Sequence, residues 1–222
     1  MTTFASQTTT VITAPNPSSM STLEAAMMDA CNELHEAVAN SDTARILELE
    51  ASISAMLDRY EACGAEAHPD PKWAVPHQRG LFLSASGNVE GAIAYEEIAL
   101  QHARTERQKE ISLGNLADRS MRAERFDDAV RYFLQARTVA PKSVPIMLTG
   151  AQALFLAGFR AEADRIFRAL LAMPHLLTFG TDLTAYLDFE TRLQVMRQDL
   201  PSLDRLMAAW EALRGEMEVG HA

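Results

Sequence analysis

The stretch RFDDAVRYFLQARTVAPKSV, residues 125–144, places apolar residues at helical intervals and then ends in a proline. Ala129, Phe133 and Ala136 follow one another at spacings of four and three residues, which put all three on one face of a helix. Small side chains let another helix approach closely, the aromatic ring fills the space beside them, and Pro141 cannot continue the helix. The stretch therefore predicts the second helix of a helix-turn-helix unit.

The same stripe recurs along the chain. Ala163 and Phe167 lie 34 residues after the first alanine and the phenylalanine of the opening stretch. Upstream, the segment GNVEGAIAYEEIALQHA supplies Ala92 and Ala99 with a spacing three residues longer. Because self-similarity at a fixed period indicates a repeat architecture, three tandem helical units are predicted over residues 73–177.

This pattern resembles the tetratricopeptide repeat (TPR), a helix-turn-helix family of about 34 residues per repeat. The best-fitting unit, residues 110–143, matches its small, aromatic and proline positions with Ala117, Phe126, Ala129, Tyr132, Phe133, Ala136 and Pro141. The first unit departs from the pattern, since Glu96 replaces the aromatic residue and Pro76 lies in its first helix. The resemblance implies an all-α fold, a right-handed α-solenoid of helix-turn-helix repeats with flanking helical hairpins.

The flanking segments have helical patterns without this signature. Ser21 and Glu24 form an S-x-x-E capping box. Residues 181–199 are predicted to form one helix, and Pro201 and Gly215 bound the last predicted helix after it. The predicted organisation is a disordered Thr/Ser-rich tail at 1–20, an acidic N-terminal helical hairpin at 21–64, a linker at 65–72, the three repeats at 73–177 and C-terminal capping helices at 178–222.

Composition and charge exclude several classes of protein. The chain has 222 residues, 48% of them hydrophobic, and a net charge of −10, so it lacks the basic surface that nucleic-acid binding needs. No run of about 20 apolar residues predicts a membrane span. Cys31 and Cys63 have no zinc-ligand spacing and suit a reducing compartment, so a cytoplasmic location is expected. The tail lacks the basic start of a secretory signal but also resembles export signals of bacterial type III secretion substrates.

Known catalytic and cofactor motifs are missing from the sequence. No nucleotide-binding, nucleophile-elbow, zinc-protease or EF-hand pattern occurs, which predicts a protein that is not an enzyme and has no cofactor or metal. His35 and His77 are interpreted as surface or packing residues. The acidic pairs Glu96 with Glu97 and Asp127 with Asp128 are expected to be solvated.

The resemblance also implies a binding surface. In TPR proteins the first helix of each repeat lines a concave groove, and matching positions assign peptide-binding roles here to His77, Leu81, Asn115, Asp118, Met121, Arg122, Gln152 and Phe155. Packing between units is the alternative role for the apolar members, and plain solvation is the alternative for Asn115. Of the carboxylate clamp found in TPR co-chaperones only Asn115 is present, so an extended or helical peptide segment is the expected ligand.

The leading hypothesis is a protein–protein interaction adaptor or chaperone that binds a peptide of another protein in the concave face. The architecture also resembles the translocator chaperones of bacterial type III secretion. The alternative is a structural subunit of a larger assembly, with a homo-oligomer formed through the N-terminal hairpin.

Overall fold

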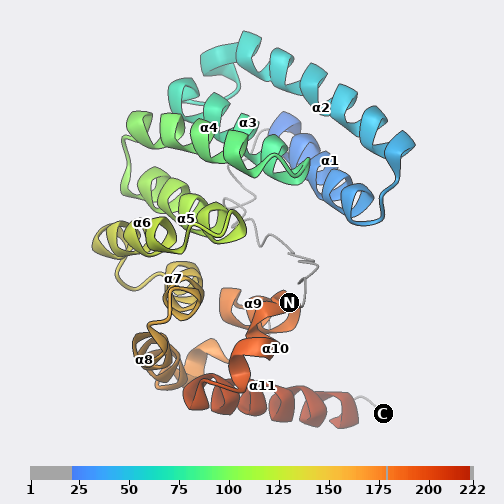
Figure 1. The fold of residues 1–222 in the computed structure, drawn as a ribbon. Helices are drawn as coiled ribbons and strands as arrows, with labels where there is room; N and C mark the ends of the chain where they lie inside the picture. Colours follow the sequence, from blue (N-terminus) through green and yellow to red (C-terminus); the bar gives the residue numbers. More distant parts are fainter. Residues whose placement is uncertain (1–21, 179, 221–222) are drawn as a thin grey trace. The chain divides into compact units, whose positions relative to one another are not determined.

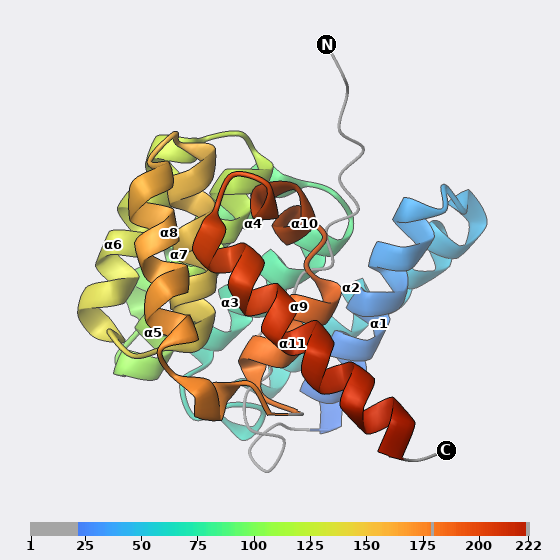
Figure 2. The same cartoon turned by 90° about the horizontal axis from the view of Figure 1, so that it is seen from below.

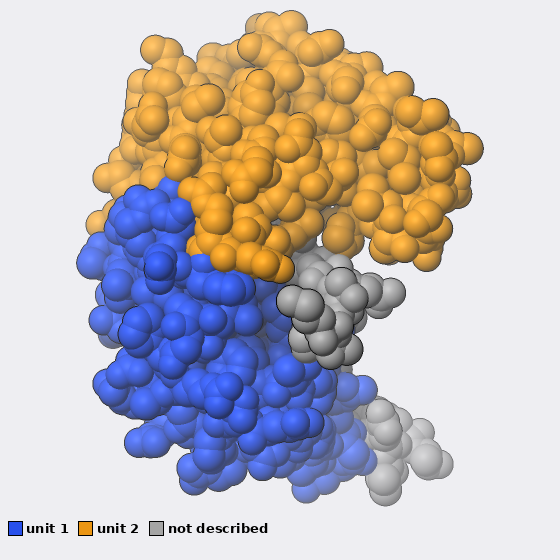
Figure 3. Space-filling view, in the orientation of Figure 1, with its two compact units in different colours: residues 1–12, 126–222 blue, residues 13–125 orange. Residues whose placement is uncertain are grey.

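The computed structural model describes residues 22–178 and 180–220, in which helices and turns occur and no strand does (Figure 1). The prediction of an all-α fold is confirmed. The predicted tail at 1–20 and Ser21 of the capping box lie outside the described residues. The chain divides after Arg125 into two compact units, coloured separately in Figure 3, which we call the N-terminal unit and the C-terminal unit.

The described residues of the N-terminal unit form five α-helices, with a short 3-10 helix at Gly64–Glu66. They are α1 (Thr22–Ala39), α2 (Thr43–Cys63), α3 (Pro71–Ala85), α4 (Val89–His102) and α5 (Glu106–Arg122). Helices α1 and α2 pack on each other and on α3, and α4 packs between α3 and α5 (Figure 1). Leu34 and Ile53 are fully buried in this packing. Glu24 is also buried, and it accepts a hydrogen bond from the Tyr60 hydroxyl.

The described residues of the C-terminal unit form six α-helices, with a short 3-10 helix at Pro174–Leu176. They are α6 (Phe126–Val139), α7 (Val144–Leu156), α8 (Arg160–Leu171), α9 (Asp182–Phe189), α10 (Arg192–Arg197) and α11 (Pro201–Gly220). Helix α7 packs between α6 and α8, and α11 lies against α8 (Figure 2). The start of α11 is held by Asp164 of α8, whose carboxylate accepts bonds from the Ser202 backbone N–H (2.7 Å) and hydroxyl (2.9 Å).

Two sequence-based expectations near the C-terminus are wrong. The segment expected to form one helix before Pro201 is divided into α9 and α10, because the buried Glu190 carboxylate accepts bonds from both the backbone and the guanidinium of Arg192. Gly215 does not end the last helix, which continues to Gly220. Gly215 keeps a negative φ, whereas a helix-terminating glycine adopts the left-handed conformation.

The same backbone turn ends α1, α3, α5 and α7. In each turn one residue has a positive φ: Ser41 (57°), Gly87 (84°), Glu124 (57°) and Gly158 (89°). After Ser41, Glu124 and Gly158 the next N–H bonds a carbonyl five residues back, as in Arg125 to Ser120 (2.8 Å), which is the Schellman arrangement. Asp42 bonds Ala37 in the same way, so the N-terminal hairpin turns like the second and third predicted repeats although its sequence lacks their signature.

The turns predict opposite effects for two substitutions. Gly158→Ala should lower the free energy of unfolding by about 1–2 kcal/mol, because an L side chain is strained at this positive φ. A Cβ atom added at position 158 would have no atom within 4 Å, so the loss would come from the backbone conformation and not from a clash. Glu124→Gly should raise it by about 0.5–1 kcal/mol, because it relieves the same strain. Chemical denaturation followed by circular dichroism measures both changes. Equal effects of the two substitutions would contradict this account.

The helix crossing between α6 and α7 depends on a residue without a side chain. Phe133 is 1% exposed, and Ala129 and Ala136 beside it are fully buried. Gly150 of α7 faces the Phe133 ring so closely that a Cβ atom at position 150 would overlap the ring. The aromatic residue of the opening stretch therefore packs where the next helix offers a glycine.

Gly150→Ala should therefore destabilise the protein by about 1–3 kcal/mol, although alanine is the better helix former, because the methyl group displaces a buried ring. Gly215→Ala is the matched control, since this helical glycine has nothing within 4 Å of its Cβ. The control should be stabilised by about 0.5–1 kcal/mol. Thermal and urea unfolding of both variants measure the difference, and stabilisation of both would show that the crossing is looser than described.

Candidate functional site

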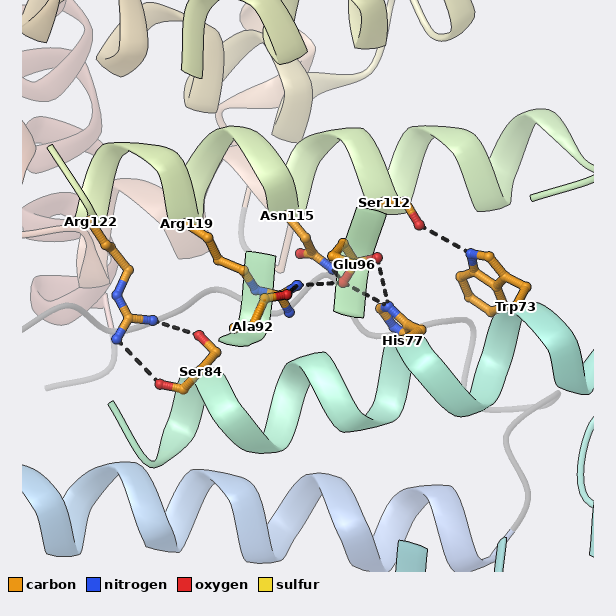
Figure 4. Close-up of polar contacts among 9 residues, drawn as sticks. All are labelled: Trp73, His77, Ser84, Ala92, Glu96, Ser112, Asn115, Arg119 and Arg122. Carbon is orange, nitrogen blue, oxygen red and sulfur yellow. Dashed lines mark hydrogen bonds and ion pairs between the residues drawn. The ribbon is translucent and has the colours of Figure 1, made fainter. Parts of the chain in front are cut away.

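A buried carboxylate joins three helices of the N-terminal unit (Figure 4). Glu96 of α4 has no exposed surface, and its Oε2 accepts a hydrogen bond from Arg119 Nη1 of α5 at 2.5 Å. The Nδ1 atom of His77 on α3 lies 3.1 Å from Glu96 Oε1. Asn115 donates a longer bond of 3.4 Å to Oε2. The expectation that Glu96 is solvated is therefore wrong, because basic and amide groups of two neighbouring helices enclose it.

Further stacking and hydrogen-bond contacts surround the residues that bind Glu96. The Trp73 ring stacks on His77 with 4.7 Å between ring centroids, and its indole N–H donates to Ser112 Oγ at 3.1 Å (Figure 4). Arg119 also donates to the carbonyl of Ala92 at 3.3 Å. Gly80 leaves room for the guanidinium, since a Cβ at this position would lie 3.1 Å from Arg119 Nη1. We call Trp73, His77, Glu96, Ser112, Asn115 and Arg119 the polar cluster.

The polar cluster keeps Glu96 ionised. Burial alone raises the pKa of this carboxyl group, but the nearby His77 and Arg119, with hydrogen bonds from His77 and Ser112, outweigh burial and lower the pKa from 4.5 to about 2. A carboxylate with so low a pKa is a poor proton donor or acceptor near neutral pH. The cluster therefore serves to hold α3, α4 and α5 together.

Glu96→Gln should reduce the free energy of unfolding by about 3–5 kcal/mol, because it leaves the buried Arg119 charge without its counter-ion. Glu90→Gln on the same helix is the control, since the Glu90 pair with Arg125 is exposed and worth about 0–1 kcal/mol. The double variant Glu96→Gln/Arg119→Gln should lose less than the sum of its single changes.

The same measurement has a defined pH dependence. Because the pKa of Glu96 is lower in the folded protein, its stabilising effect is complete above pH 4.5 and is lost as the pH falls toward about 2. The stability difference between the wild-type protein and Glu96→Gln should therefore narrow over this interval. A difference that stays constant down to pH 2 would contradict the ion pair.

Most residues assigned to a peptide groove have internal roles. His77, Leu81, Met121 and Gln152 are all at most 8% exposed. His77 belongs to the polar cluster, and the Gln152 amide bonds the Tyr186 hydroxyl within the C-terminal unit. Burial leaves these four side chains no surface for a ligand.

The other four assigned residues are partly exposed. Asn115 points to Glu96, and Arg122 donates to Ser84 Oγ at 2.7 Å and to the Ser84 carbonyl at 3.3 Å (Figure 4). Phe155 in the C-terminal unit lies 5.5 Å from the guanidinium of Arg160. Asp118 is half-buried on α5. The donors expected to bind a peptide backbone are thus largely used to connect helices.

An open groove lies on another face of the N-terminal unit. It has a volume of about 810 Å³ and lies between the end of α2, the first half of α3 and the second half of α4. Its apolar floor includes Tyr95 and Ile98, which are 36% and 42% exposed. We call this the α2–α4 groove; it is lined by Glu61, Gly64, Pro71, Lys72, Val75, Pro76, Arg79, Tyr95, Ile98 and His102.

The sequence of α4 contains a pattern that could have indicated this groove. The repeat pattern accounts for Ala92 and Ala99 on the buried face of α4. Tyr95, Ile98 and His102 recur at intervals of three and four residues on a different face of the same helix. A helix with apolar residues on two faces indicates a second contact surface, in addition to the one that packs in the repeat.

Other kinds of site find no support in the part of the chain that the structure describes. No group of three or more His, Cys, Asp or Glu side chains there could hold a metal ion, and no described helix is both long and apolar enough to cross a membrane. Both cysteines are free, and burial raises the pKa of the Cys31 thiol to about 12, which makes it a poor nucleophile.

Comparison with protein-family models, curated proteins and solved structures finds no match to this chain. The geometry of the described residues is therefore the basis on which a function is proposed.

Proposed function

We propose that this chain is a non-catalytic adaptor built from TPR-like helical repeats, and that it holds a segment of a partner protein in the α2–α4 groove. The observation that supports this most directly is the groove itself, where Tyr95 and Ile98 expose apolar surface on a helix whose other face is buried. Concave apolar surfaces with a few polar groups are the usual form of binding sites.

The repeat architecture is supported by local geometry. Four helices end at a residue with a positive φ, three of them in a Schellman turn, and small residues occupy close helix contacts, as Gly150 does against Phe133. Helical repeats present extended surfaces on a stable frame, and in this family they bind other proteins. Both the turns and the packing support the proposed TPR assignment.

The frame beneath the groove is rigid, which favours binding over catalysis. Helix α3 is joined to α4 and α5 by the polar cluster, and Arg79 on the groove wall donates to Glu61 of α2 at 2.6 Å. A preformed site loses little side-chain entropy when a ligand binds. The hydrogen bond to Glu61 also raises the already high pKa of Arg79, so the guanidinium on the groove wall stays charged.

Site-specific cross-linking tests this function. With Ile98 replaced by benzoylphenylalanine, irradiation of the full chain in extracts of its source cells should yield a discrete adduct with one protein, because the ring lies on the groove floor. The same replacement at Leu47, which is 63% exposed on α2 and does not line the groove, is the matched control. Mass spectrometry identifies the products.

A second change separates specific from accidental labelling. Val75→Glu, which places a charge on the groove wall, should reduce the adduct at position 98 by about tenfold. Labelling that is equal at positions 98 and 47 would contradict the proposal. An adduct between two copies of this chain would instead support the structural, oligomer-forming alternative.

A further inference from the structure

The cations along the α2–α4 groove are not equally paired. Arg79 is paired with Glu61 at 2.6 Å and lies 3.7 Å from Asp58. Lys72 and His102, by contrast, have no hydrogen-bond or ion-pair partner among the described residues. Residues 1–72 contain eleven acids and only three basic residues, so an unpaired lysine in this acidic part of the chain is unusual.

The start of α3 adds to the positive potential beside Lys72. Asp70 precedes this helix, but its side chain makes no capping bond to the first turn. The Asp70 carboxylate instead accepts from Gln108 Nε2 at 3.3 Å and lies 3.8 Å from Arg104. The first turn of α3 therefore combines the partial positive charge of a helix amino end with the charge of its second residue, Lys72.

We infer that the α2–α4 groove binds an acidic–apolar segment of a partner protein, with apolar side chains against Tyr95 and Ile98 and a carboxylate at Lys72. This inference rests on the proposed adaptor function and specifies the chemistry of its ligand. The two aspects of the groove match the two parts of such a segment, since the apolar floor buries side chains and the unpaired cation compensates one charge.

The carboxylates around Arg79 make a polyanion a poorer ligand for this groove than an acidic–apolar segment. Glu61 lines the groove and Asp58 lies 3.7 Å from Arg79, and both carboxylates would repel a run of phosphates. A segment with one or two carboxylates among apolar residues avoids these acids and still reaches Lys72. A basic segment would meet Lys72 and the amino end of α3 with the wrong sign.

A peptide-display selection on the intact chain tests the inference. The probe is a random dodecapeptide library selected on the immobilised wild-type protein, followed by fluorescence anisotropy of the enriched peptides. We expect peptides that combine Asp or Glu with Leu, Ile, Phe or Trp. Their affinity should fall about tenfold or more in Lys72→Glu, which reverses one groove charge, and in Ile98→Glu, which breaks the apolar floor.

Two controls match these variants. Lys109→Glu reverses an exposed lysine of the same unit that does not line the groove, and Leu47→Glu charges an exposed leucine away from it. Neither should change the affinity by more than about twofold. A selection repeated on Lys72→Glu should enrich Lys or Arg in place of the acids, a reversal that a change in folding would not produce.

The outcomes distinguish failure of the acidic–apolar ligand from failure of the proposed adaptor function. Peptides that depend on Ile98 but contain no acid, and bind Lys72→Glu equally well, would overturn the acidic–apolar ligand while leaving the adaptor function intact. The absence of any peptide that depends on Ile98 would overturn both. A wild-type dimer in light scattering that dissociates in Ile98→Glu, or tight binding of a synthetic peptide of residues 1–20, would assign the groove to the chain itself and overturn the inference.

Discussion

The N-terminal unit depends on one buried charge. Glu96 has no exposed surface, and an isolated carboxylate in such a place costs several kcal/mol. It is tolerated because Arg119 and His77, from helices on either side, supply charge and hydrogen bonds at 2.5 and 3.1 Å. Apolar helix surfaces can slide past one another at small cost, whereas this contact is satisfied in one register only. The position of α3 and α5 relative to α4 follows from it.

The C-terminal unit solves the same packing problem without charge. In the matching position of the next predicted repeat stands Phe133, whose ring lies against Gly150. A ring opposite a glycine needs no counter-ion, but it needs the small residue, just as Arg119 needs Gly80. The two units therefore share a repeat pattern and the turn that ends the helices, while the groups that hold their helices in place differ.

These internal contacts also limit which side chains are available to the proposed partner. Residues expected to line a peptide groove, among them His77, Asn115 and Arg122, are engaged with Glu96 and Ser84. What remains open is the α2–α4 groove, where Tyr95 and Ile98 are 36% and 42% exposed. The exposed apolar groove and its unpaired lysine are the features on which the proposed adaptor function rests.

The sequence by itself determined the elements that depend on neighbours along the chain. Periodic apolar residues, Pro201 at a helix start, and Gly87 and Gly158 at left-handed turns are local signals, so the all-α fold and most helix positions could be predicted. The division of α9 from α10 could not be predicted, because it depends on a bond between the Glu190 side chain and the backbone that no periodicity encodes.

Only the tertiary structure decided which polar residues are buried and which face solvent. Glu96 and Glu97 are identical and adjacent in the sequence, yet Glu96 alone lies opposite Arg119 and His77, because successive residues on a helix point about 100° apart. Likewise, the repeat pattern assigned Gln152 to ligand binding, whereas in the folded chain its amide bonds the Tyr186 hydroxyl. The sequence shows the type of each side chain, whereas its partners come from helices 20 to 40 residues away, and only folding brings them together.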